Sequence, residues 1–239
     1  MLVAAAVCPC PPLLVPQLAA GAAAELDALR VACSDAVAVL AASRPDLLVV
    51  LGPARGPERP GVYPEGTGGS FQGFGVDLSV RLGQPFAARA EPAQELPASL
   101  AVAAWLLGRC AWTAAPVEGL ALGEELAEDC FRAGRDLAAR AGRVALLVMG
   151  DGSACRTLKA PGYLDVRAAQ FDEGLARALG TADVRALAEI DVATARELQV
   201  AGRAPWQALA GAAEGAGLDG RLLRAEAPYG VGYFVGTWS

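Results

Sequence analysis

Two short runs of apolar residues decide the fold: Leu47-Leu-Val-Val-Leu51 and Val144-Ala-Leu-Leu-Val-Met149. Each run is uniformly apolar and about as long as one strand, a pattern typical of a strand buried on both faces of a parallel sheet. Both runs lead into loops that are rich in glycine, Gly52 to Ser70 and Gly150 to Ser153. Ligands of parallel sheets lie outside the C-terminal ends of the strands, so these loops are where a site is expected.

Outward from these two runs, short apolar segments alternate with longer segments of helical periodicity. We expect further strands at 2–7, 71–80, 221–227 and 231–235, and helices at 21–42, 97–107, 123–140, 163–179 and 191–210. The stretch 52–70 is expected to be an irregular loop because it is dense in glycine and proline. This alternation predicts an α/β fold, with a mostly parallel sheet and helices on both faces. No linker or second core interrupts the pattern, so residues 1–239 are interpreted as a single domain.

Composition excludes several classes of function. The net charge of −6 and a pI near 4.8 argue against a nucleic-acid-binding protein, which needs clustered lysine and arginine. No apolar run is long enough to span a membrane, and no basic segment precedes the apolar start as in a secretory signal. The six cysteines follow no disulfide or zinc-finger spacing. We therefore expect a cytoplasmic protein with reduced cysteines.

The absence of histidine restricts the chemistry further. Ser-His-Asp and Cys-His mechanisms need an imidazole base, so neither is available. Ser153 lies in Gly150-Asp-Gly-Ser-Ala-Cys155, which is not a Gly-x-Ser-x-Gly nucleophile motif. The glycine loops also lack the Gly-Lys-Ser/Thr ending of a phosphate-binding loop.

Three loops compete to form the site: residues 8–16, 52–70 and 150–162. Cys8 and Cys10 are two residues apart, so in an extended backbone both thiols would project to the same side. Two thiolates there would suit zinc or copper(I), with Cys155 or Asp151 completing the ligand set. The alternative interpretation is that both are reduced thiols that pack at the end of a strand.

Two charged residues in these loops also have two interpretations each. Asp151 follows a buried strand and is either aimed into a cleft or a turn-forming aspartate, as Asp-Gly pairs often are. Arg55 either binds an anionic ligand or pairs with Glu58 at the surface.

Several motifs together resemble those of the LigB-like superfamily, which includes class III extradiol ring-cleavage dioxygenases and the Memo proteins. The resemblance lies in Val7-Cys-Pro-Cys-Pro-Pro12, Leu51-Gly-Pro-Ala-Arg-Gly56, Gly150-Asp-Gly-Ser-Ala-Cys155, Ala201-Gly-Arg-Ala-Pro205 and the terminal strand that carries Tyr233. The motifs are short but span most of the chain and occur in the family's order. The resemblance implies the LigB/Memo fold.

The same resemblance implies a degenerate metal site. In the dioxygenases, two histidines and one carboxylate hold ferrous iron, whereas this chain has no histidine and places Cys10 and Arg55 in the corresponding loops. We therefore expect no ferrous iron and no other cofactor.

The favoured hypothesis is a binding or regulatory protein that holds a small anionic ligand or a protein partner in the old cleft, without nucleic acid or membrane. Its expected ligand-binding residues are Cys8, Cys10, Arg55, Asp151 and Ser153. The alternative is an enzyme with a rebuilt thiolate and carboxylate site around Cys8, Cys10, Asp151 and Cys155.

Overall fold

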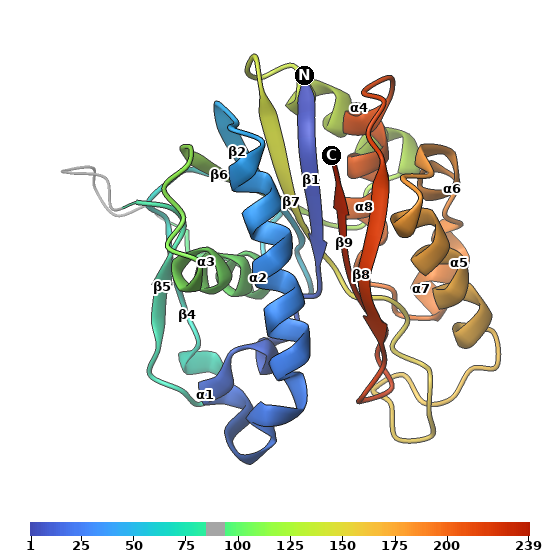
Figure 1. The fold of residues 1–239 in the computed structure, drawn as a ribbon. Coiled ribbons are helices and arrows are strands. Elements are labelled where there is room, and N and C mark those ends of the chain that lie inside the picture. Colours follow the sequence, from blue (N-terminus) through green and yellow to red (C-terminus); the bar gives the residue numbers. More distant parts are fainter. Residues whose placement is uncertain (85–93) are drawn as a thin grey trace.

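The structure, a computed structural model, describes residues 1–84 and 94–239. A seven-stranded sheet with the order β3-β6-β2-β7-β1-β9-β8 forms its centre (Figure 1). The four strands β6, β2, β7 and β1 run parallel, while β3 and β9 pair antiparallel with their neighbours β6 and β1, and β8 pairs antiparallel with β9. The strand bounds are β1 Leu2–Cys8, β2 Leu47–Pro53, β3 Gly61–Tyr63, β6 Val117–Leu122, β7 Val144–Met149, β8 Gly220–Glu226 and β9 Tyr233–Trp238.

Helices cover both faces of this sheet, which confirms the predicted α/β class (Figure 1). Successive residues of β1 and β7 point to opposite faces, so the strands contribute alternately to two apolar cores. One core is closed by α2 Asp27–Ala42 and α3 Ala98–Arg109. The other is closed by α4 Ala127–Ala138, α5 Ala168–Gly180, α6 Val184–Ala188, α7 Val192–Glu197 and α8 Arg203–Ala213.

Helices α4 and α8 pack unusually closely because each has a glycine at the contact. A Cβ atom at Gly134 would lie 1.8 Å from the Ala208 carbonyl oxygen, and one at Gly211 would lie 1.9 Å from that of Phe131. No side chain fits at either position without moving one helix. The two glycines therefore fix the spacing of the helical layer behind the sheet.

The segment between β1 and α2 is built from short turns, which are η1 Pro12–Leu14, α1 Pro16–Ala19 and the 3₁₀ segment η2 Ala20–Leu26. The helix expected from residue 21 therefore becomes α-helical only at Asp27. Arg30, which is 1% exposed, holds this segment in place. Its guanidinium donates hydrogen bonds to the Leu14 and Ala23 carbonyl oxygens, both at 2.7 Å. These bonds hold the segment between β1 and α2 against α2.

Three predictions of elements are wrong. The glycine- and proline-rich stretch 52–70 contains β3 and β4 Gly68–Ser70, because pairing with β6 and with β5 Ser79–Arg81 supplies the hydrogen bonds. The strand expected at 71–80 is instead the 3₁₀ turn η3 Gln72–Phe74 followed by β5. The helix expected at 191–210 is divided into α7 and α8.

Strand β6 escapes prediction because Glu118 and Gly119 interrupt its apolar pattern. Gly119 is needed there, since a Cβ atom would lie 2.9 Å from a Leu100 methyl group. Close packing of the sheet against α3 thus removes the signal that identifies the other central strands.

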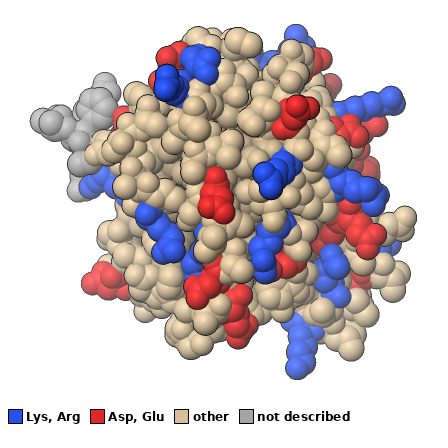
Figure 2. Space-filling view, in the orientation of Figure 1, with Lys and Arg blue, Asp and Glu red and all other residues tan. Residues whose placement is uncertain are grey.

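Charges of both signs are interspersed over the face in Figure 2, without an extended area of one sign. Among the described residues, no helix has both the length and the apolarity that crossing a membrane requires.

Candidate functional site

Cys10 and Asp151 meet at the C-terminal edge of the sheet because β1 and β7 are adjacent parallel strands. Cys8 pairs with Met149 at the last position of the ladder, and the Gly150 N–H then donates to the Cys8 carbonyl oxygen at 3.0 Å. Just beyond this bond, the Cys10 N–H donates to Asp151 Oδ1 at 2.8 Å. This bond joins the two loops and fixes the orientation of the carboxyl group.

Burial governs the chemistry of this pair, since Cys10 and Asp151 are each only 7% exposed. Burial raises the pKa of Asp151 to about 6, against the opposing effects of the Cys10 N–H and the Arg55 guanidinium. Burial, together with the negative charge of Asp151, raises the pKa of the Cys10 thiol well above its ordinary value. Cys10 is therefore a neutral thiol at physiological pH, while Asp151 changes its protonation in a mildly acidic range.

Arg55 lies close enough to this pair to influence both groups electrostatically. Its backbone N–H donates to Glu58 Oε2 at 2.7 Å, but its guanidinium lies within 4.0 Å of no described carboxylate. Glu58 instead uses Oε1 to accept the Ala98 N–H at 2.7 Å, at the N-terminus of α3. The helix terminus therefore compensates the Glu58 charge, and the exposed Arg55 side chain keeps its donors for another partner.

One tyrosine of the C-terminal hairpin borders the same centre, and a second links the hairpin to η2. Tyr233 is 2% exposed, and its pKa is raised by burial and by the nearby Asp151 and Cys10. The Tyr229 hydroxyl donates to Glu25 Oε2 at 3.0 Å, which links the loop before β9 to η2. Sequence reasoning already names Glu58 beside Arg55 but does not place Tyr233 at the site, because only the antiparallel pairing of β9 with β1 brings Tyr233 there.

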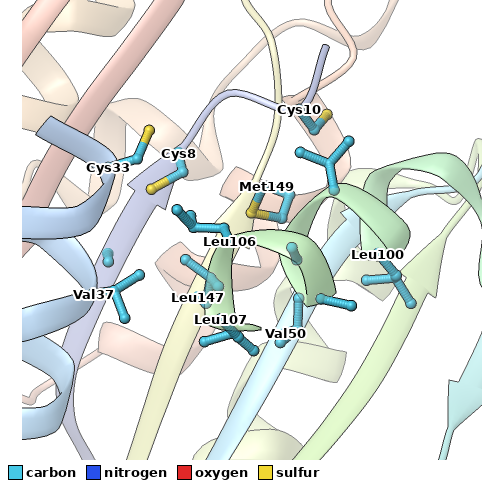
Figure 3. Packing of buried hydrophobic residues seen from close by; sticks show 14 of the residues in the cluster. Cys8, Cys10, Cys33, Val37, Val50, Leu100, Leu106, Leu107, Leu147 and Met149 are labelled. Carbon is cyan, nitrogen blue, oxygen red and sulfur yellow. The ribbon is translucent and has the colours of Figure 1, made fainter. Parts of the chain in front are cut away.

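Cys8 does not share a pocket with Cys10, contrary to expectation. Figure 3 shows the Cys8 side chain beside Cys33 of α2, whereas Cys10 lies beyond the end of the strand. A hydrogen bond of the Cys8 thiol to Cys33 and complete burial raise the pKa of Cys8 well above its ordinary value. The same-side rule holds only within an extended strand, and β1 ends at Cys8.

Ser153 and Cys155 also lie outside the centre. Ser153 is fully buried, and its N–H and hydroxyl both donate to Asp172 of α5 at 2.8 Å. Arg156 completes this cluster with a hydrogen bond of 3.0 Å to Asp172 Oδ2. The Cys155 thiol lies 3.5 Å from the Leu198 carbonyl oxygen, within the core on the opposite face of the sheet. Both residues therefore anchor the 150–162 loop rather than face a ligand.

The donor set at this edge does not fit ferrous iron. Cys10 and Asp151 supply one thiol and one carboxyl group, the chain has no imidazole, and the Arg55 cation is near enough to act on both groups. Among the described residues, no three His, Cys, Asp or Glu side chains are grouped so that they could hold a metal ion.

Comparison with known proteins adds a likeness of fold. No protein-family profile and no curated protein matches the chain. The structure is similar to the crystal structure of the uncharacterized protein JW3007 from Escherichia coli K12, with a TM-score of 0.55 and 15% sequence identity. The alignment covers 99% of both chains, so the likeness extends over the whole fold.

Proposed function

We propose that this chain is a LigB-like homologue without the iron site, and that it binds a small anion at the C-terminal edge of its sheet. The observation that carries the proposal is the arrangement around Asp151. The Arg55 guanidinium forms no ion pair with a described carboxylate, and it is near enough to lower the pKa of the buried Asp151 carboxyl group, which a backbone hydrogen bond holds in place. Arg55 would supply the positive charge that attracts the anion, and the Cys10–Asp151 pair would line the base of the anion site.

The protonation of Asp151 sets how the site responds to pH. Ionised Asp151 would repel an anion, whereas the protonated carboxyl group can donate a hydrogen bond to it. Because the pKa of Asp151 is raised to about 6, anion binding should strengthen as the pH falls through that value. A small carboxylate is a suitable ligand class, because its two oxygens can accept from Arg55 and from Asp151 separately.

A rebuilt thiolate enzyme has less support. Of its four expected residues, only Cys10 and Asp151 lie together, and burial keeps Cys10 in the thiol form that is a poor nucleophile.

Calorimetric titration with benzoate at a pH of about 6 tests the proposal, with the neutral isostere benzamide as a ligand control. We expect Arg55→Gln to weaken benzoate binding by about tenfold or more, as for the loss of a charge-assisted hydrogen bond. Arg59→Gln, an exposed arginine in the same loop, should bind as the wild type does. Equal binding by wild type and Arg55→Gln, or no binding by either, would refute the proposal.

A further inference from the structure

A separate feature of the molecule is a groove of about 400 Å³ between β5, α1 and α3, away from the Cys10–Asp151 centre. Strand β5 and the preceding Leu78 form one wall. The other walls come from the start of α1 and from the second half of α3, which includes Trp105 and Arg109.

The hydrogen-bond pattern of β5 shows that its edge facing away from β4 is open among the described residues. Leu78 and Leu82 bond to the strand side occupied by β4, through Phe71 N–H to Leu78 O at 2.9 Å and Leu82 N–H to Thr67 O at 3.0 Å. Alternate residues of a strand direct their backbone groups to opposite edges. The N–H and C=O groups of Ser79 and Arg81 therefore point away from β4, and no described residue bonds to them.

The charges that line the groove are all positive. Arg81 and Arg109 contribute two guanidinium groups, and no acidic residue lines the groove. Neither arginine lies within 4.0 Å of a described carboxylate. Arg109 is placed over the Trp105 ring, 5.9 Å from its centre. The local field thus differs from the net charge of −6 of the chain and would attract an acidic partner.

We propose that this groove binds an extended acidic peptide, which adds a strand to the open edge of β5. Backbone groups of the peptide would pair with Ser79 and Arg81, as in other cases of strand addition. Acidic side chains on the outer face would lie near Arg81 and Arg109, and apolar side chains on the inner face would contact Trp105. The three residues of β5 limit the pairing to about 10 Å of peptide.

An acetylated and amidated hexapeptide of alternating glutamate and valine is a direct probe. Binding is followed by tryptophan fluorescence and by amide shifts in ¹H–¹⁵N spectra of the full chain. We expect the Ser79 and Arg81 amides to shift, because they form the new pairing. The same peptide with lysine in place of glutamate should bind at least about tenfold more weakly, since it meets two like charges.

Two changes separate strand addition from general charge attraction. The probe with N-methyl groups on the amides that face β5 keeps all charges but cannot donate, so its affinity should fall about tenfold. On the protein, Ser79→Pro removes an N–H that the β4–β5 pair does not use and should have the same effect. Arg44→Gln, which removes a positive charge outside the groove, should leave the affinity for the peptide unchanged.

Loss of affinity on N-methylation supports the proposal even if Ser79→Pro fails to fold. Equal affinity for the N-methylated and unmodified peptides would overturn it, as would shifts that avoid Ser79 and Arg81. Association of the chain with itself through β5, detected by sedimentation without peptide, would also overturn it in favour of a second copy as the occupant.

Discussion

Ionisation of Asp151 destabilises the folded state, because the carboxyl group is buried and no cation is in direct contact with it. Its pKa is about 6 in the folded protein and near the ordinary value of 3.8 in the unfolded chain. Between these values the folded state binds more protons at Asp151 than the unfolded state does, so the contribution of Asp151 to stability is most favourable below about pH 4 and falls as the pH rises through about 6. The difference in pKa corresponds to about 3 kcal/mol.

Asp151→Asn should remove this pH dependence, because the asparagine carbonyl still accepts the Cys10 N–H but does not ionise. We expect the free energy of unfolding of the variant, relative to the wild type, to rise by about 2 kcal/mol between about pH 4.5 and pH 8, because part of the full difference already lies below pH 4.5. Urea unfolding of both proteins across this range measures the difference. If the two proteins keep a constant difference, the assigned environment of Asp151 is incorrect.

Asp172 is a buried carboxylate with a structural role, and sequence reasoning does not identify it. It is 1% exposed and accepts hydrogen bonds from Ser153 and Arg156, which hold the 150–162 loop against α5. Asp172→Ala would leave buried donors without a partner, so we expect a loss of about 3–5 kcal/mol in the free energy of unfolding. Glu189→Ala breaks an exposed pair with Arg185 and should have little measurable effect. Equal urea unfolding midpoints for Asp172→Ala and Glu189→Ala would contradict the structural role of Asp172.

At the residue scale, the sequence alone predicts only part of the site. It predicts that Asp151, Arg55 and Cys10 lie at one edge of the sheet, because they follow strands whose C-terminal ends converge there. It does not show that Ser153 faces Asp172, since that contact depends on how α5 packs behind the loop. It also cannot separate Cys8 from Cys10, because the separation depends on the position at which β1 ends.

At the scale of elements, the spacing between α4 and α8 depends on Gly134. Gly134→Ala should force the helices apart and lower the free energy of unfolding by about 1–3 kcal/mol, the usual cost of overpacking. Gly174→Ala is the matched control, because a Cβ there in α5 meets only the end of Arg177 at 4.0 Å. That variant should gain up to about 1 kcal/mol from helix propensity. Thermal unfolding of both variants checks the opposite signs; a shared sign would argue against the packing described.

The hydrogen bond between Tyr229 and Glu25 connects the loop before β9 to the segment that follows Cys10. Tyr229→Phe removes this bond, so we expect alkylation of Cys10 by iodoacetamide to accelerate by about three- to tenfold. Peptide mass spectrometry measures the rate, with Cys110 as an internal reference. Tyr163→Phe alters a tyrosine that is 62% exposed and should leave the rate unchanged. An unchanged rate in Tyr229→Phe would show that the link does not restrict access.

For the whole molecule, the α/β class follows from the sequence because two uniformly apolar runs alternate with segments of helical periodicity. The peripheral elements do not follow. Strands β3, β4 and β5 are three residues each and depend on pairing partners rather than on local propensity. Strand β6 is not predicted, because Gly119, which the packing against α3 requires, interrupts its apolar pattern.

The central claim is that the Cys10–Asp151–Arg55 edge receives a small anion. The most direct test is a ¹H–¹⁵N spectrum of the isotope-labelled chain titrated with benzoate at a pH of about 6. We predict saturable shifts concentrated at the amides of Cys10, Arg55 and Gly152, and their loss in Arg55→Gln. Shifts confined to other parts of the chain, or no saturable shifts, would contradict the account.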